Sequence, residues 1–272
     1  MTPRAGFRYR GRPREVRLLA RPNRFLVRVV PVRGGRPFEA HLPNPGRMEE
    51  LLVPGETRGW VVPAGGPGRR TQFDLVTVRH GRELVNVDSR VANRLVGAAL
   101  RRGRWPGLGL GRIDAEVPYG GRRFDFAVRG DTPGDLPRVL VEVKSSNLRV
   151  GDLALFPDAP TERGRHHVAL LGRAAASGVR TAVLFVIQRR GVAGFDTNRA
   201  LDPAFASALD RAARAGVRVA AVATRVRPGG IALDRAVPWR PRRRRTPFVG
   251  AAPIAAVDER AAAVERDPRA PR

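Results

Sequence analysis

The chain has 272 residues, 42% of them hydrophobic, with no cysteine and a formal net charge of +26. This length is enough for one large domain or two smaller ones, and the lack of cysteine excludes a disulfide scaffold and a thiolate metal site. No apolar run is long enough to cross a bilayer, and the arginine-rich N-terminus lacks the apolar core of a secretory signal. We therefore expect a cytoplasmic protein without a membrane segment.

The charge of the chain predicts a polyanionic partner. Cations outnumber acids by 51 to 25. A codon bias toward Ala, Arg, Gly and Pro explains why arginine replaces lysine, but it does not explain the excess of cations. Such a surface attracts nucleic acid because each neutralised phosphate releases condensed counterions. We expect DNA, held mainly through its phosphate backbone; the sequence does not separate DNA from RNA, and no basic amphipathic helix points to a membrane.

The N-terminal part of the chain has the pattern of a small β-barrel, which we assign to residues 14–82. Residues 1–13 are rich in Arg, Pro and Gly and are expected to be a loose basic extension. The expected elements of the barrel are a β-hairpin over residues 23–43, a short helix over 47–52, and strands over 57–63 and 72–80.

The pattern then changes to alternating strands and helices. Three helices are expected to follow the N-cap residues Asp88, Thr161 and Asp202. Strands are expected over residues 113–120, 122–129, 138–145, 179–188 and 217–224. Strand–helix–strand alternation implies parallel pairing, so we expect an α/β domain over residues 83–238, followed by a basic, disordered tail over 239–272.

Three polar residues on two of these strands form a candidate site. Side chains alternate across a strand, so Glu142 and Lys144 share one face, and Asp125 projects from the preceding strand. If the two strands pair, Asp125 and Glu142 converge, and a cation is expected between them because an unpaired buried carboxylate is costly. Carboxylates with retained water suit Mg²⁺ or Mn²⁺.

Lys144 is the only lysine in the chain. A compact ammonium can position an attacking water and neutralise charge on a phosphate, whereas arginine is larger, planar and permanently protonated. The alternative is that the Glu-x-Lys pair is solvated charge on a half-exposed strand, as such short motifs usually are. The strand context, the preceding Asp125 and the single lysine favour a catalytic set.

Longer sequence blocks carry a family resemblance. They include HLPNPGRMEELLVPG, VNVDSRVANRLV, VEVKS and FPDAPTERGRHH, in this order. Over residues 21–224 the chain resembles the sugar fermentation stimulation protein A family. The resemblance implies an N-terminal OB fold and a C-terminal domain similar to PD-(D/E)xK nucleases. It also implies that Asp125 and Glu142 are metal ligands, that Lys144 is catalytic and that Glu116 is an additional upstream acid.

Other cationic side chains are candidates for phosphate contact. Arg163 and His166 lie three residues apart on one helix face and can meet a phosphate near the helix N-terminus. The alternative is an ordinary capped helix with both side chains in solvent. Arg47, which follows the Asn44-Pro45-Gly46 turn, is a further candidate, although turn residues more often serve the turn alone.

Two functions fit these observations. The first is a non-specific nucleic-acid-binding protein that cleaves phosphodiesters with Mg²⁺. The second, implied by the family resemblance, is a non-enzymatic DNA-binding regulator of sugar (maltose) metabolism on a nuclease-like scaffold. The complete acid–acid–lysine set favours the first function, and the lack of a clear helix-turn-helix disfavours a sequence-specific repressor.

Overall fold

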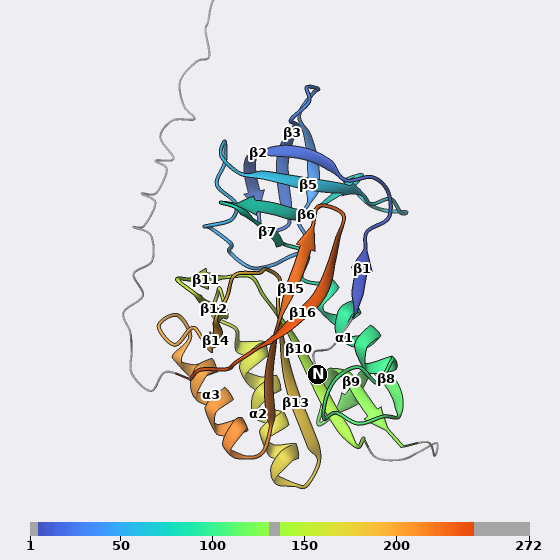
Figure 1. The fold of residues 1–272 in the computed structure, drawn as a ribbon, viewed down its shortest axis with the longest axis vertical. Coiled ribbons are helices and arrows are strands. Elements are labelled where there is room, and N and C mark those ends of the chain that lie inside the picture. The colour runs from blue at the N-terminus through green and yellow to red at the C-terminus, as the bar shows by residue number, and fades with distance from the viewer. Residues whose placement is uncertain (1–4, 131–136, 242–272) are drawn as a thin grey trace, which may run out of the picture.

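The computed structural model describes residues 5–130 and 137–241, which form a β-barrel above an α/β domain (Figure 1). The α/β class with an N-terminal barrel, expected from the sequence, is confirmed in these residues. None of the helices they contain is long and apolar enough to span a membrane.

The barrel consists of short strands around one apolar core. In the described range its strands are β2 (Arg14–Asn23), β3 (Leu26–Pro31), β4 (Phe38–His41), β5 (Arg58–Pro63), β6 (Phe73–His80) and β7 (Glu83–Asn86), paired in the order β4-β3-β2-β5-β6-β7. A further bridge between His41 and Asp74 joins β4 to β6 and closes strands β2 to β6 into a cylinder. Val27 and Val29, two residues apart, both point into its core.

The α/β domain is a mixed sheet with helices on both faces. Its helices are α1 (Val91–Arg101), α2 (Glu162–Ala176) and α3 (Pro203–Arg214). Within the described residues the sheet has the order β1-β16-β15-β13-β10-β9-β8, with β1 (Gly6–Arg8), β8 (Arg112–Tyr119), β9 (Arg122–Arg129), β10 (Val139–Ser146), β13 (Arg180–Ile187), β15 (Arg218–Arg227) and β16 (Gly230–Val237). Strands β10, β13 and β15 are parallel, as the strand–helix alternation predicted. A small separate sheet contains β11 (Arg149–Val150), β12 (Leu153–Phe156) and β14 (Gly194–Thr197).

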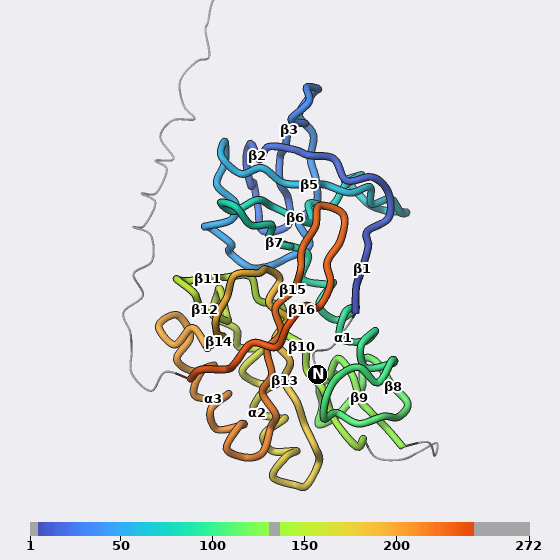
Figure 2. Tube along the Cα trace, viewed as in Figure 1, coloured from blue at the N-terminus to red at the C-terminus, as the bar shows by residue number. Residues whose placement is uncertain are grey.

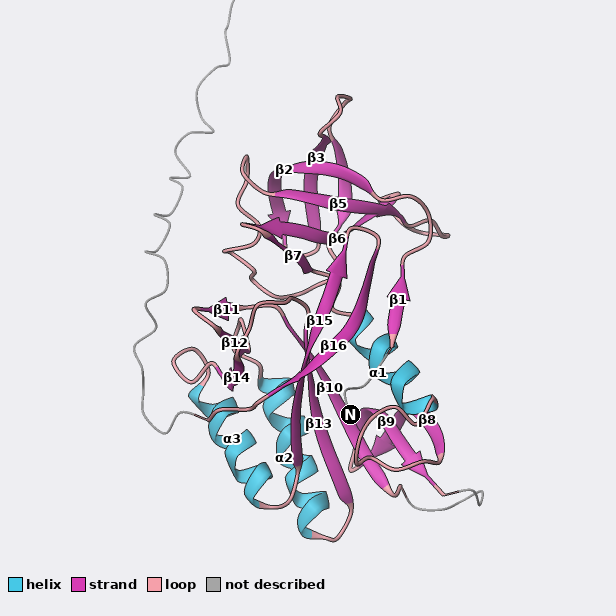
Figure 3. Ribbon diagram, in the orientation of Figure 1, coloured by secondary structure: helices cyan, strands magenta, loops and turns pink. Residues whose placement is uncertain are grey.

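Strand β10 separates two apolar clusters, one beneath each helical layer. Figure 3 shows α2 and α3 on one side of the sheet and α1 on the other. Val141 and Val143 belong to the cluster on the α1 side, whereas Leu140 belongs to the cluster of α2 and α3. The predicted alternation along β10 is therefore confirmed, and it turns Glu142 and Lys144 toward the α2 side.

The alternation predicted for β9 breaks at Asp125. Phe126 packs on the α1 side, but Phe124 belongs to the cluster on the opposite side, although residues two apart on a regular strand share a face. The β8–β9 ladder skips the pair of Glu116 and Asp125, and Glu116 has a φ of 53°. The change of face therefore coincides with a local break in the β8–β9 pairing.

Two predictions at the N-terminus and in the barrel were wrong. Residues 1–13 are not all loose, because Gly6–Arg8 form β1 beside β16, with Phe7 packed against the α1-side core. Residues 47–52 form a turn and no helix. Only seven residues separate two Pro-Gly pairs there, which is too short for helix propagation.

The domain limits also differ from those predicted. The barrel sheet continues past residue 82, since β7 pairs with β6. Strand β16, which the sequence analysis did not predict, extends the α/β sheet. Of the predicted tail, Trp239 bridges to Phe195, and residues 242–272 lie outside the described residues.

Candidate active site

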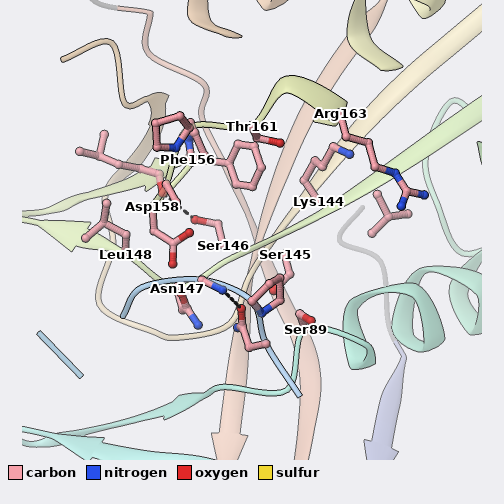
Figure 4. Close-up of a pocket in the computed structure, with 18 of the residues that line it drawn as sticks. Ser89, Lys144, Ser145, Ser146, Asn147, Leu148, Phe156, Asp158, Thr161 and Arg163 are labelled. Carbon is pink, nitrogen blue, oxygen red and sulfur yellow. Dashed lines mark hydrogen bonds between the residues drawn. The ribbon is translucent and has the colours of Figure 1, made fainter. Parts of the chain in front are cut away.

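A cavity of about 420 Å³ lies where the barrel meets the α/β domain. Its lining includes Asp125, Glu142 and Lys144, which the structure therefore brings together as predicted, and also Arg163. Figure 4 shows Lys144 and Arg163 at the same end of this cavity. Sites for small ligands commonly measure about 300–1,000 Å³, so the cavity has room for a nucleotide-sized group.

The cavity opens where strands β9 and β10 separate. Their ladder ends at Val141, whereas β10 continues beside β13 as far as Ser146. Beyond this point the Asp125 carboxylate accepts a hydrogen bond from the backbone N–H of Val143, with Oδ2 and N 2.7 Å apart. A side chain thus replaces the lost backbone pairing, and the carboxylate is fixed at the edge of the gap.

Both carboxylate oxygens of Asp125 are held. Oδ1 accepts a hydrogen bond from Nδ2 of Asn93 in α1 at 2.6 Å, in addition to the bond from Val143 to Oδ2. Burial, together with the nearby charge of Glu142, raises the pKa of Asp125 to about 6. Two carboxylates that oppose each other's ionisation in this way favour the binding of a cation between them.

Glu142 is buried and has two cationic or donor neighbours. Its Oε1 lies 2.5 Å from Nζ of Lys144 and 2.7 Å from Nδ1 of His167. Burial acts to raise the pKa of Glu142, but the hydrogen bond from His167 and the charge of Lys144 outweigh it and hold the pKa below its usual value. Glu142 is therefore ionised at neutral pH.

The structure brings to the carboxylate site a histidine that the sequence analysis did not single out. His166 is exposed, whereas His167 is 3% exposed and contacts Glu142. The signal was present in the sequence, because Gly164, His167, Val168 and Leu171 follow the i, i+3, i+4, i+7 spacing of a buried helix face.

Two other predicted residues are not part of this cavity. Glu116 is exposed and does not line it, so the structure does not bring this acid to the carboxylate pair. Arg47 is exposed and lines a neighbouring cavity of about 210 Å³. Of the three proposed phosphate contacts, Arg163 alone lines the carboxylate cavity among the described residues.

The barrel supplies one wall of the cavity, which the sequence analysis did not foresee. Residues 44–46 form this wall. The loop is fastened to the α/β domain by Ser89, whose Oγ donates to the carbonyl of Pro43 at 2.9 Å. A Cβ atom on Gly46 would lie 2.2 Å from Oδ2 of Asp158, so a larger residue here would have to displace that carboxylate. The wall is consequently fixed relative to the carboxylates.

The donor set fits a hard divalent cation. No cluster of three or more His, Asp or Glu side chains in the described part of the chain is placed to hold a metal. The oxygens of Asp125 and Glu142 suit instead an ion such as Mg²⁺, which commonly binds one or two carboxylates, keeps several waters and takes further oxygens from a phosphate.

Fold and site together define a class of protein, in which a closed β-barrel is joined to an α/β domain that carries a carboxylate pair and a lysine. Residues 19–87 match the SfsA N-terminal OB domain, and residues 90–230 match the sugar fermentation stimulation protein RE domain. The barrel is therefore an OB domain. The chain belongs to the sugar fermentation stimulation protein family, as its sequence blocks predicted.

Relatives match over most of their length. A sugar fermentation stimulation protein homolog from Chloroflexus aurantiacus is 40% identical, over 82% of this chain and 84% of the relative. A homolog from Moorella thermoacetica is 41% identical, over 79% of this chain and 91% of the relative. The solved structure of Pyrococcus furiosus SfsA in complex with Ca²⁺ is 26% identical, with a TM-score of 0.76 over 88% of this chain and 99% of that one.

Proposed function

We propose that this protein is a divalent-cation-dependent phosphodiesterase that binds nucleic acid with little sequence preference. The observation that carries the proposal is the pair Asp125 and Glu142, held where the β9–β10 ladder ends, with Lys144 beside Glu142 in the same cavity. Mg²⁺ or Mn²⁺ is the expected ion. The Ca²⁺ complex of the Pyrococcus furiosus relative supports a hard divalent cation in this fold.

Each residue has a role that follows from its position. Asp125 and Glu142 would hold the ion, which supplies a polarised phosphate and a more acidic water. The ammonium of Lys144 is placed to orient the attacking water and to offset charge that develops on the phosphate. Arg163 lies at the same end of the cavity, where its guanidinium group can donate hydrogen bonds to the oxygens of a phosphate.

The second candidate is a non-enzymatic DNA-binding regulator on the same scaffold. The relatives carry the name sugar fermentation stimulation protein homolog, which describes a physiological role and no cleavage reaction. The net charge of +26 supports nucleic-acid binding with or without chemistry. A nuclease-like fold does not by itself imply activity.

A cleavage assay separates the two candidates. Labelled single- and double-stranded DNA and RNA would be incubated with the protein in Mg²⁺, in Mn²⁺ and in chelator. We expect cleavage that requires the metal and is lost in Glu142→Gln. Absence of cleavage on every substrate, with salt-sensitive binding intact, would favour the regulator.

Ion binding provides an independent readout of the same site. Calorimetry with Mn²⁺ should give a binding isotherm for the wild-type protein that is much weaker in Glu142→Gln, while circular dichroism of the two proteins stays the same. Equal Mn²⁺ affinity of the two proteins would remove the metal-site assignment.

A further inference from the structure

A second groove, of about 640 Å³, lies on the sheet of the α/β domain where β1, β16 and β15 run side by side. Figure 2 shows the N-terminal strand next to the hairpin formed near the other end of the chain. This groove and the carboxylate cavity share no lining residue, so the groove is a separate feature of the described structure.

The register of the three strands places arginines along both sides of a floor of small residues. Arg8 on β1 and Arg227 on β15 are both paired with Gly230 of β16, which lies between them. Two residues along, Gly6 and Arg225 are both paired with Ala232. Residues two apart on a strand share a face, so these six residues lie on one face of the sheet.

No helical layer covers this face at the groove. The alternate residues Phe7, Val226 and Ile231 point to the other face, where they pack against the α1-side core. At the groove this face carries the exposed side chains of Arg8, Arg225 and Arg227. The parts of the same face that are covered by helices carry apolar side chains instead. This end of the sheet therefore presents charge to solvent.

The positive charge of the groove is largely uncompensated. Arg225 donates to Oδ1 of Asp234 at 2.7 Å. In the part of the chain that the structure describes, neither Arg8 nor Arg227 forms an ion pair with an acidic side chain. Two guanidinium groups thus remain available to an anion on opposite sides of the floor.

We propose that this groove binds the phosphodiester backbone of a nucleic acid strand. Guanidinium groups bind phosphate oxygens in pairs of parallel hydrogen bonds, and arginine suits this geometry better than lysine. Arg8 and Arg227 are two strand spacings apart, about 9.5 Å between their Cα atoms, which matches a single backbone laid between them. The glycines and alanine of the floor leave room for that backbone to approach the sheet.

The site contacts phosphate and reads no bases. Its contribution to binding depends on salt, since log K falls by about 0.7 to 0.9 per neutralised phosphate for each decade of salt. It is also independent of the carboxylate cavity, so it requires neither metal nor cleavage. This independence allows the groove to be tested even if the protein has no nuclease activity.

The test compares two variants that lose the same charge. Arg8→Gln with Arg227→Gln removes the unpaired guanidinium groups of the groove. Arg173→Gln with Arg214→Gln, on exposed positions of α2 and α3, removes two charges elsewhere. All four positions are exposed, so both variants should fold, and circular dichroism would verify this.

Binding of a fluorescein-labelled oligothymidylate and of a labelled DNA duplex would be measured by anisotropy in chelator, over a series of salt concentrations. We expect the groove variant to lose about 1.4 to 1.8 from the slope of log K against log salt, the equivalent of two phosphate contacts, and the control to keep the wild-type slope. Equal slopes for the two variants, or a wild-type protein that binds neither probe, would overturn the proposal. Because chelator withholds the proposed metal from the carboxylate cavity, this measurement reports on the groove and not on the cleavage site.

Discussion

Nδ1 of His167 lies 2.7 Å from Oε1 of Glu142, and both side chains are almost fully buried. The ionised carboxylate of Glu142 can only accept a hydrogen bond, so the ring of His167 carries its proton on Nδ1 and donates it. His167 comes from α2 and Glu142 from β10, and the contact therefore links the helix to the strand that carries the proposed metal ligand. A rigid aromatic ring at this position fixes the carboxylate before an ion arrives.

Replacing His167 with Ala should weaken the binding of Mn²⁺ by about 10- to 100-fold, the usual cost of removing a partner that orients a metal ligand. Glu142 would lose the hydrogen bond from His167 that orients its carboxylate, while it would remain buried. Calorimetry with Mn²⁺ measures the change. His166→Ala is the matched control, because the neighbouring ring is exposed, and its Mn²⁺ affinity should equal that of wild type. A variant of His167 with wild-type affinity would show that the contact is only structural.

Replacing Lys144 with Arg should lower single-turnover cleavage by about 10²- to 10³-fold, the range typical of losing one group aimed at charge that develops in the transition state. The positive charge beside Glu142 is retained, so Mn²⁺ affinity should change by only a few fold. The planar guanidinium is larger than the ammonium and cannot reproduce its position. Cleavage at the wild-type rate would mean that Lys144 acts only as a charge.

Asp74 makes the stability of the barrel depend on pH. This buried carboxylate lies 2.7 Å from Arg90 and is also paired with Arg69. Burial by itself would raise the pKa of Asp74. The hydrogen bonds and charges of the two arginines have the larger effect, and they hold the pKa below the ordinary value of 3.8. Because the pKa of Asp74 is lower in the folded state, its ionised carboxylate stabilises the fold at pH values above 3.8. This stabilisation is lost as the pH falls through the pKa that Asp74 has in the folded state.

Asp74→Asn should therefore lower the free energy of unfolding by about 1–3 kcal/mol at pH 7, and by less at pH 3. Urea denaturation at the two pH values measures this difference. Glu39→Gln is a suitable control, since that side chain is exposed on β4. A loss that is the same at both pH values would contradict the role of the ionised carboxylate.

Glu83 and Arg189 join the barrel to the α/β domain. Arg189 is fully buried, and its Nε lies 3.2 Å from Oε2 of Glu83 in β7. Glu83→Ala leaves this guanidinium without its carboxylate, and we expect a loss of about 3 kcal/mol in the free energy of unfolding. Arg149→Ala removes the more exposed partner of Glu83 and should cost about 1 kcal/mol or less. Similar losses for both variants, in urea denaturation at pH 7, would contradict this distinction.

The sequence by itself determined that Glu142 and Lys144 lie on the same side of one strand. The two-residue repeat of a strand is set by covalent geometry, so Glu142 and Lys144 had to share a face wherever the strand packed. The predicted caps Thr161 and Asp202 likewise marked the starts of α2 and α3, because backbone N–H groups at helix ends need local partners. These features depend only on neighbours along the chain. Asp88 does not cap α1, whose N-cap is Arg90 and has no side-chain cap.

Tertiary structure alone decided which distant segments meet. Adjacent His166 and His167 differ in their environment because α2 packs on the sheet at one particular rotation. Arg8 and Arg227 flank one groove because β1 and β15 both pair with β16. The turn at residues 44–46 forms a wall of the cavity because the barrel is fastened to the α/β domain. Such long-range pairings depend on the burial of apolar area and on sheet register, which no local pattern along the chain encodes.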